Sequence, residues 1–258
     1  LKNSGHSIDE RLEVYDKYPE LLSRRDDCYL DKLTLLSQKG MYKEAIDMAK
    51  SKHFHIYEGG EGKLTKQHAW MHVLYANELV KDGKLDEARK IYNDGINMPK
   101  SYGEAKTFFN QEAHIYYYLA KLEQRENNTE KYTADLEKAA EYKAAVSEIS
   151  LFRALALKEL GKNDEANAVL DEMQESADSL INNCDMRTYY GVGSPSPMPF
   201  ELDIVKNNLV AGNILKAYAL YGMEKYGEAD LCIRKAAELD ADNFAVYAFG
   251  KISETAEM

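Results

Sequence analysis

Apolar side chains recur along this chain at intervals of three and four residues, within long stretches that contain no proline. This interval places them on one side of a helix, whose period is 3.6 residues. Four such stripes are clear: Tyr29, Leu33 and Leu36; Ala69, Val73, Ala76 and Val80; Ile149, Leu151, Ala154 and Leu155; and Ile214, Ala217, Tyr218 and Tyr221. No segment shows the sustained alternation that is typical of a strand. The pattern therefore predicts an all-α fold.

Three serines are predicted to stand at helix starts. Ser7 and Ser101 are each followed three residues later by a glutamate, and Ser23 by an aspartate. A serine hydroxyl can accept a hydrogen bond from a free N–H of the first helical turn, while the acidic side chain reaches back to the serine N–H. We therefore expect helices to begin just after these serines.

A short motif recurs and divides the chain into helix pairs. Residues 40–45 read Gly-Met-Tyr-Lys-Glu-Ala, and the same Gly-to-Ala spacing returns at 83–88 and 161–166. A looser copy starts at Gly222, and a degenerate copy without glycine follows Asn128. Glycine ends a helix cheaply in the left-handed conformation, an aromatic residue or Leu two positions later closes the turn, and alanine lets the second helix pack closely. A helical hairpin of this kind cannot bury its apolar face alone, so neighbouring hairpins are expected to stack.

The glycine, aromatic and alanine positions of this motif resemble the tetratricopeptide family. The resemblance implies an α-α superhelix, which here would be an irregular solenoid. Ala45 and Ala88 are 43 residues apart, and Ala166 and Ala229 are 63 apart, whereas the family unit is about 34 residues. We expect one repeat domain over residues 1–258, with non-helical loops near 52–64 and 189–201. The proline-rich segment 191–200 is either a lid over a groove or a spacer between hairpins.

Three segments, residues 25–30, 53–62 and 194–200, carry a closer resemblance. Together they are similar to the C-terminal tetratricopeptide region of large bacterial proteins that begin with a β-rich domain of unknown function, often linked to carbohydrate utilisation. The string Glu-Gly-Gly-Glu-Gly at 58–62 is its most specific part. Since the chain also starts at Leu1 without a methionine, we expect it to be a piece of a longer protein.

This resemblance implies an interaction or scaffold module rather than a free-standing enzyme. The expected partner is the upstream domain of the same polypeptide, or a peptide of another protein lying on the hairpins. The candidate binding residues are Arg25, Asp26, Asp27, His53, His55, Tyr57, Glu58, Gly59, Gly60, Glu61 and Gly62.

A carbohydrate is the alternative ligand. Glu58 and Glu61 lie three residues apart in a glycine-rich loop, and glycosidases use two carboxylates separated by roughly 5–9 Å. With His55, they would complete a carbohydrate-processing centre shared with the missing domain. The other interpretation is an ordered connector, in which the glycines supply unusual dihedral angles and the glutamates cap the next helix or face solvent.

Four of the six histidines, His53, His55, His68 and His72, fall within twenty residues. His68 and His72 are spaced to share one helix face, as metal ligands often are. The residues between them do not form a His-Glu-x-x-His motif, so the sequence favours packed or surface histidines. We predict no metal and no cofactor.

Charge and cysteine content narrow the class of partner. The net charge of −11 disfavours nucleic acid, because phosphate contacts need clustered Lys and Arg. No apolar run reaches the roughly 18 residues of a membrane span. Cys28, Cys184 and Cys232 are too scattered for a disulfide framework or a zinc site, and suit a reducing compartment. We therefore expect a cytoplasmic protein that binds neither nucleic acid nor membrane.

Overall fold

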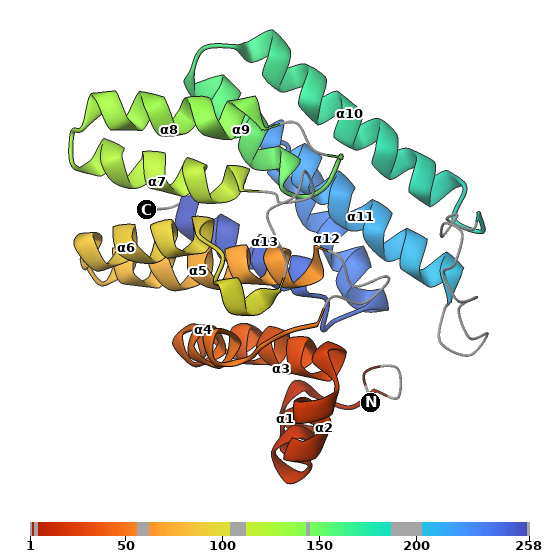
Figure 1. The fold of residues 1–258 in the computed structure, drawn as a ribbon. Coiled ribbons are helices and arrows are strands. Elements are labelled where there is room, and N and C mark those ends of the chain that lie inside the picture. Colours follow the sequence, from red (N-terminus) through yellow and green to blue (C-terminus); the bar gives the residue numbers. More distant parts are fainter. Residues whose placement is uncertain are drawn as a thin grey trace. The chain divides into compact units, whose positions relative to one another are not determined.

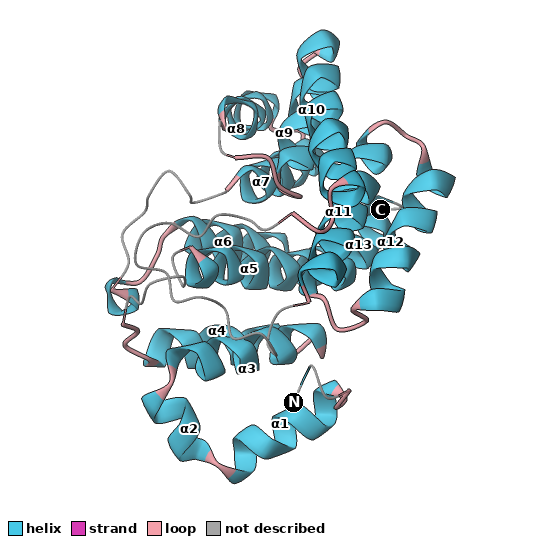
Figure 2. Ribbon diagram, turned by 90° about the vertical axis from the view of Figure 1, so that its right-hand side faces the viewer, coloured by secondary structure: helices cyan, strands magenta, loops and turns pink. Residues whose placement is uncertain are grey.

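The computed structural model describes residues 2, 5–55, 62–103, 112–142, 145–186 and 203–256. Within these ranges the chain forms thirteen α-helices and a short 3-10 helix, with no strand (Figure 2). The prediction of an all-α fold is confirmed. The chain divides into two compact units, residues 1–132 and 133–258. The expected single repeat domain over the whole chain stays a prediction.

All eleven candidate binding residues fall within the residue range of unit 1. Its helices are α1 (Ile8–Lys17), α2 (Pro19–Arg24), α3 (Asp26–Gln38), α4 (Tyr42–Ser51), α5 (Lys63–Lys81), α6 (Leu85–Ile96), η2 (Lys100–Tyr102) and α7 (Ala113–Arg125). Helix α3 packs on α4 and α5 on α6, and α4 also contacts α5. Figure 1 shows the α3–α4 pair and the α5–α6 pair as successive layers of this unit.

Residues 129–141 form α8 (Thr129–Glu141), which includes the boundary at 132/133, and five helices follow in the described part of unit 2. These are α9 (Ser150–Glu159), α10 (Asn163–Asn182), α11 (Ile204–Gly222), α12 (Tyr226–Leu239) and α13 (Phe244–Ala256). Helix α10 packs between α9 and α11, and α11 packs on α12. Helix α13 lies against both α11 and α12. No helix in the described part of the chain combines the length and apolar content that a membrane crossing requires.

The predicted turn glycines end their helices as expected. Gly40, Gly83 and Gly161 each have φ of +75°, the left-handed region that glycine enters without a Cβ clash. In each case the N–H of the next residue donates to the carbonyl five residues before it; Lys84 bonds to Leu79 at 2.8 Å, for example. This bond is the mark of a Schellman motif, which satisfies free carbonyls at the helix end. These turns join α3 to α4, α5 to α6 and α9 to α10.

Two further turns have the same geometry without glycine. Asn127 (φ 59°) and Glu224 (φ 64°) occupy the left-handed position, and Asn128 and Lys225 make the same backbone bond at 2.9 Å. The turn predicted at the degenerate copy of the motif, near Asn128, is therefore present. The looser copy also contains its turn, but the left-handed residue is Glu224, because Gly222 is the last residue of α11. A Cβ at Gly222 would lie 2.5 Å from Leu170, so this glycine serves close packing of α10 on α11.

The motif alanines are buried as predicted, with Ala45, Ala88 and Ala166 at 0% exposure. Closure of the turn by an aromatic residue is less general. Tyr42 is buried, but Tyr226 is 57% exposed. The alanine position, which faces the partner helix, is therefore the more constrained of the two.

Helix starts follow the prediction at one serine only. Ser7 and Glu10 form the complete capping box of α1. Ser23 lies inside α2, where its hydroxyl donates to the Glu20 carbonyl, and α3 instead begins after Arg25. Ser101 lies within the 3-10 helix η2, and its expected partner at 104 is outside the described residues.

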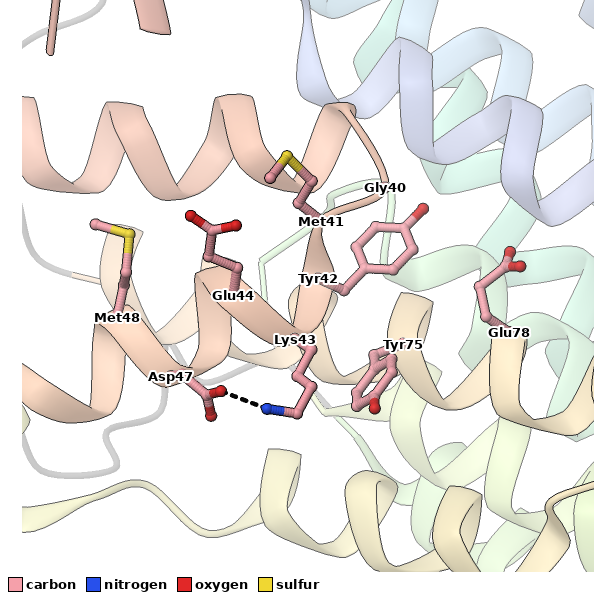
Figure 3. Close-up of a pocket in the computed structure, with 9 residues that line it drawn as sticks. All are labelled: Gly40, Met41, Tyr42, Lys43, Glu44, Asp47, Met48, Tyr75 and Glu78. Carbon is pink, nitrogen blue, oxygen red and sulfur yellow. Dashed lines mark hydrogen bonds and ion pairs between the residues drawn. The ribbon is translucent and has the colours of Figure 1, made fainter. Parts of the chain in front are cut away.

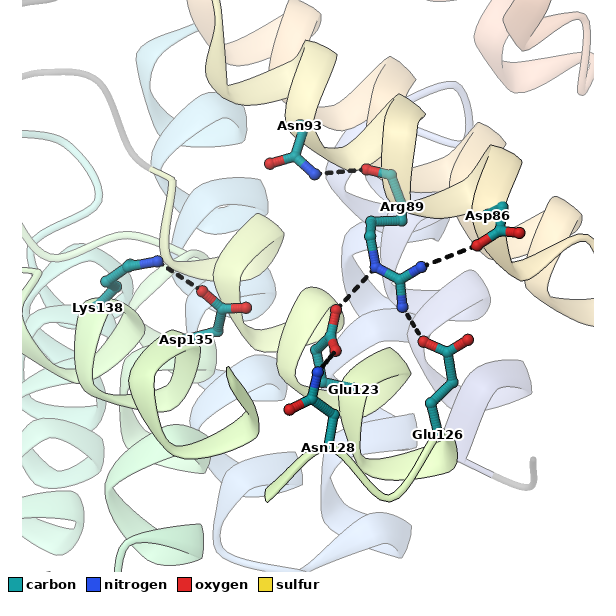
Figure 4. A network of polar contacts seen from close by, with 8 residues as sticks. All are labelled: Asp86, Arg89, Asn93, Glu123, Glu126, Asn128, Asp135 and Lys138. Carbon is teal, nitrogen blue, oxygen red and sulfur yellow. Dashed lines mark hydrogen bonds and ion pairs between the residues drawn. The ribbon is translucent and has the colours of Figure 1, made fainter. Parts of the chain in front are cut away.

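A buried carboxylate ties α6 to the end of α7 (Figure 4). Glu123 is 2% exposed and accepts from Nε of Arg89 at 2.8 Å and from the side-chain amide of Asn128 at 2.9 Å. The same guanidinium pairs with Glu126, and with Asp86 at 3.2 Å. Burying a carboxylate is costly unless it is paired and hydrogen-bonded, and here both of its oxygens are occupied.

Candidate functional site

The structure describes six of the eleven candidate binding residues. Arg25 is the residue before α3, Asp26 and Asp27 begin that helix, and His53 and His55 follow α4. The remaining five, Tyr57, Glu58, Gly59, Gly60 and Glu61, lie outside the described residues. The predicted carbohydrate centre at Glu58, Glu61 and His55 therefore stays a prediction.

Gly62 marks the start of α5. Its φ of 75° confirms that a glycine of this loop supplies an unusual dihedral angle. Its carbonyl accepts from the Thr65 hydroxyl at 2.9 Å and from the Lys66 N–H at 3.0 Å. Helix α5 begins at Lys63, within the range near 52–64 where a loop was predicted, and residues 52–55 are non-helical; residues 56–61 lie outside the described residues. The second predicted loop, 189–201, lies outside the described residues.

Asp26 joins the two described halves of the candidate site. Its Oδ2 accepts from the backbone N–H of His55 at 2.6 Å and lies 3.3 Å from Nδ1 of that ring. Its Oδ1 pairs with Nζ of Lys52 at 2.9 Å. Burial by itself would raise the pKa of Asp26, but the bonds from His55 and Lys52 outweigh it and lower the pKa. Asp26 is thus an ionised anchor that holds the chain after α4 against the start of α3.

Arg25 and Asp27, by contrast, pair with each other. Arg25 donates from Nε to Oδ1 of Asp27 at 3.0 Å, and from its terminal nitrogen to Oδ2 at 2.5 Å. Both side chains are largely exposed, at 62% and 45%. Hydrogen bonding to Arg25 lowers the pKa of Asp27. The two residues form a surface pair beside Asp26, and a ligand would have to compete with that pair for either charge.

The segment between Lys52 and His55 is also held from its other side. The Phe54 N–H donates to the Ser101 carbonyl at 3.2 Å, and the Phe54 ring packs edge-on between Tyr29 and Tyr102, at centroid distances of 5.6 and 5.5 Å. A Cβ at Gly103, whose φ is +66°, would come 2.9 Å from the Phe54 carbonyl. Buried Phe54 therefore leaves the flanking rings of His53 and His55 exposed, and these two lie edge to face at 5.3 Å.

His68 is buried in α5 and uses both ring nitrogens. Its Nε2 lies 3.1 Å from the Asp94 carbonyl, which only accepts, so this nitrogen carries the proton. Nδ1, 3.0 Å from the Tyr102 hydroxyl, therefore accepts from it. Burial, assisted by nearby His72, lowers the pKa of His68 to about 3. His68 is a neutral core residue.

His72 is also buried and neutral. Its Nδ1 donates to the His68 carbonyl at 2.7 Å, and burial lowers its pKa to about 4. The facing position on α6 is Gly95, where a Cβ would lie 2.8 Å from the Cβ of His72. The histidine pair was interpreted from sequence as packed or surface residues, and the structure shows it packed. Among the described residues no group of three or more His, Cys, Asp or Glu side chains is placed to hold a metal ion.

Sequence reasoning missed Tyr102, because Ser101 to Gly103 was interpreted as a helix start. Tyr102 is 1% exposed and joins η2 to both Phe54 and His68. A single aromatic residue between two turn-forming residues carries little periodic signal. Its role depends on contacts with residues 34 and 48 positions away.

A second feature missed from sequence is an open hollow on α4 and α5, of about 670 Å³ (Figure 3). It is lined by the turn residues Gly40 and Met41, by Tyr42, Lys43, Glu44, Asp47 and Met48 of α4, and by Tyr75 and Glu78 of α5. It combines aromatic rings, thioethers and carboxylates in one place. Helical periodicity predicts which face of each helix is apolar, but not which two helices meet to form a depression.

Comparison with the models of known protein families gives no match to this chain.

Proposed function

We propose that this chain is a tetratricopeptide-like interaction module of a larger bacterial protein, and that it docks an adjacent domain or a partner segment on its helical hairpins. The observation that carries the proposal is the recurrence of one turn. Five helix pairs are joined through a left-handed residue and the same backbone bond, at residues 40, 83, 127, 161 and 224. Repeated hairpins of this type are the building units of helical-repeat scaffolds.

The physical basis is the way in which such hairpins are stabilised. Each buries its apolar side against the next, as α4 does against α5 in unit 1. The outer sides of the helices are left for contacts with other polypeptides. Surfaces of this kind bind extended segments or neighbouring domains without any catalytic group.

The exposed end of the candidate site is the first place to look for such a contact. His53 and His55 lie at the surface, while Phe54 and Asp26 hold their backbone in place. Rings presented on a fixed backbone lose little conformational freedom when a partner binds. We infer that these two rings contact the docked polypeptide.

Hydrogen exchange with the upstream polypeptide of the full-length protein, added as a separate chain, tests this function. We expect slower exchange in the amides of residues 53–55 and 62–66 when it is present. A His53→Ala/His55→Ala variant should bind it about tenfold more weakly, which is the cost of losing one well-packed contact. His6→Ala, another exposed histidine of unit 1, is the matched control and should bind normally. Absence of binding, or equal binding by the double variant and the wild type, would reject docking at this place.

A further inference from the structure

The hollow on α4 and α5 is lined by none of the candidate binding residues and has its own chemistry. In Figure 3 Tyr42, Tyr75 and Glu78 lie toward one end, while Glu44, Asp47 and Met48 lie toward the other. Its volume of about 670 Å³ is within the range of ligand sites, which run from about 300 to 1,000 Å³. An open hollow of this size accommodates a side chain with the backbone on either side of it.

The apolar part of the lining is unusually accessible. Met41 is 42% exposed although it is a large apolar residue, and Tyr75 and Met48 are half-buried. Thioethers adapt to the shape of an apolar stem, and the face of a tyrosine ring attracts a cation. These groups favour a side chain that has an apolar stem and a positively charged head.

The charges in the hollow do not balance. The lining contains three carboxylates, Glu44, Asp47 and Glu78, and one ammonium group, Lys43. Lys43 is held by Asp47 at 2.7 Å, and Glu78 pairs with Lys81 at 3.2 Å. Within the described residues Glu44 makes no ion pair. A hollow whose lining carries this excess of negative charge is complementary to an incoming cation.

We propose that this hollow binds an arginine side chain presented by a segment of a partner protein. Arginine suits it better than lysine, because a planar guanidinium can stack on a tyrosine ring and pair with a carboxylate at the same time. Its methylene stem would lie against Met41, and its charged head would stack on Tyr75 and face Glu78 at the same end of the hollow. Glu44 at the other end would add to the negative potential. The inference rests on the proposed docking function and gives it a second contact with a defined partner chemistry.

A nuclear magnetic resonance titration of the ¹⁵N-labelled chain tests the site with two probe peptides. The first is acetyl-Leu-Arg-Leu-amide; the second replaces arginine with citrulline, which has nearly the same shape but no charge. We expect the arginine peptide to shift the amides of residues 40–48 and 75–78, and the citrulline peptide to bind about tenfold more weakly. Sodium chloride at 0.5 M should lower the affinity of the arginine peptide toward that of the citrulline peptide, because salt screens exposed charges.

Variants locate the charge contact. Glu78→Gln removes the carboxylate beside the guanidinium and should weaken binding of the arginine peptide about fivefold, whereas Glu44→Gln, at the other end of the hollow, should weaken it about twofold. Neither substitution should disturb the fold, because both side chains are at the surface. Glu13→Gln, an exposed glutamate of α1, is the matched control and should leave binding unchanged. A Tyr75→Leu variant keeps the apolar contact but removes the aromatic ring. It should weaken binding of the arginine peptide and leave binding of the citrulline peptide unchanged.

Two results would overturn the inference. Equal binding of the two peptides would make the hollow a purely apolar site. No shift of the amides of residues 40–48 and 75–78 at peptide concentrations up to about 10 mM would mean that the hollow does not bind the peptide. If these occur while the upstream polypeptide still binds near His53 and His55, the docking function stands and only the arginine site is wrong. If the arginine peptide binds the hollow but the upstream polypeptide does not bind at all, the arginine site stands and docking of that domain is wrong.

Discussion

The hydroxyl of Tyr102 donates to Nδ1 of His68 across 3.0 Å, and in doing so connects η2 to the first third of α5. The other nitrogen of His68 continues the connection to the Asp94 carbonyl in α6. The Tyr102 ring meanwhile packs on Phe54, next to the exposed histidines of the candidate site. One buried hydrogen bond therefore links the α5–α6 hairpin to the segment that we propose as a docking surface.

Removing the Tyr102 hydroxyl should destabilise unit 1. Tyr102→Phe keeps the ring contacts but leaves Nδ1 of His68 buried without a donor, which costs about 1–2 kcal/mol. Urea denaturation followed by circular dichroism measures the change. Tyr226→Phe removes a hydroxyl from a ring that is 57% exposed, and should be neutral. Equal effects of the two substitutions would mean that the bond to His68 adds nothing.

Stability should fall as the pH is lowered below 6.5. The pKa values of His68 and His72 are about 3 and about 4 in the folded chain, against 6.5 as the ordinary value. Below 6.5 the unfolded chain therefore binds protons that the folded chain does not, so protonation favours unfolding. Each histidine removes up to about 1.4 kcal/mol per pH unit, from 6.5 down to its folded pKa. Above pH 7 this contribution is fully present.

Urea denaturation at pH 7.5, 6.5 and 5.5 measures this slope. In a His68→Gln/His72→Gln variant the amides can make similar hydrogen bonds but do not titrate. The slope should therefore become shallower, and the part that remains comes from buried His114, whose pKa is lowered by burial to about 3. The comparison is made above pH 5 because carboxylates begin to titrate below it. An unchanged slope in the variant would assign the pH dependence to other groups.

The turn at Glu224 should be improved by glycine. A residue with a Cβ pays roughly 1–2 kcal/mol in the left-handed conformation, and the exposed ion pair of Glu224 with Lys158 returns less than about 1 kcal/mol. We expect Glu224→Gly to raise the free energy of unfolding by about 0.5–1 kcal/mol in a guanidinium titration. A loss of stability would show that the ion pair outweighs the backbone strain.

Alanine at a turn glycine should have the opposite effect. Gly83 has φ of +75° and no atom within 4 Å of an added Cβ, so Gly83→Ala changes the backbone energy alone. We expect a loss of about 1 kcal/mol in thermal or chemical unfolding. The matched comparison is Gly227→Ala in α12, which has the same open space and an ordinary φ, and should be neutral or stabilising.

Arg89 should matter more than other surface cations of unit 1. Arg89→Met keeps the stem but leaves Glu123, which is 2% exposed, without its positive partner. We expect a loss of about 2 kcal/mol, less than for a fully buried pair because Arg89 remains 24% exposed. Lys43→Met breaks an exposed pair within one helix and should cost under about 0.5 kcal/mol. If Arg89→Met/Glu123→Leu is no more stable than Arg89→Met, the buried charge is not the cause.

Hairpin turns were the most predictable part of this fold. Gly40, Gly83 and Gly161 predict the positions of their turns, because only glycine enters the left-handed region at little cost. Where another residue takes the left-handed position, as Glu224 does, the nearest glycine gives the wrong position for the turn. Gly222 is present for a different reason, since α10 approaches too closely for a side chain there.

The candidate site was predictable only in its local parts. The unusual dihedral angle of a loop glycine, found at Gly62, and the buried apolar faces follow from short-range pattern. That Asp26 would bond the backbone of His55, 29 residues later, does not, because many acidic residues stand at helix starts. Its choice of partner depends on where α4 ends in space.

What the sequence determined by itself is the all-helical class and the position of most turns, because backbone dihedral preferences and apolar spacing act over a few residues. The tertiary structure decided which buried polar groups meet, as in the chain from Asp94 through His68 to Tyr102. It also decided where a hollow opens between α4 and α5. Both depend on how closely neighbouring helices approach, which is set by packing many side chains at once and is not encoded at any one position.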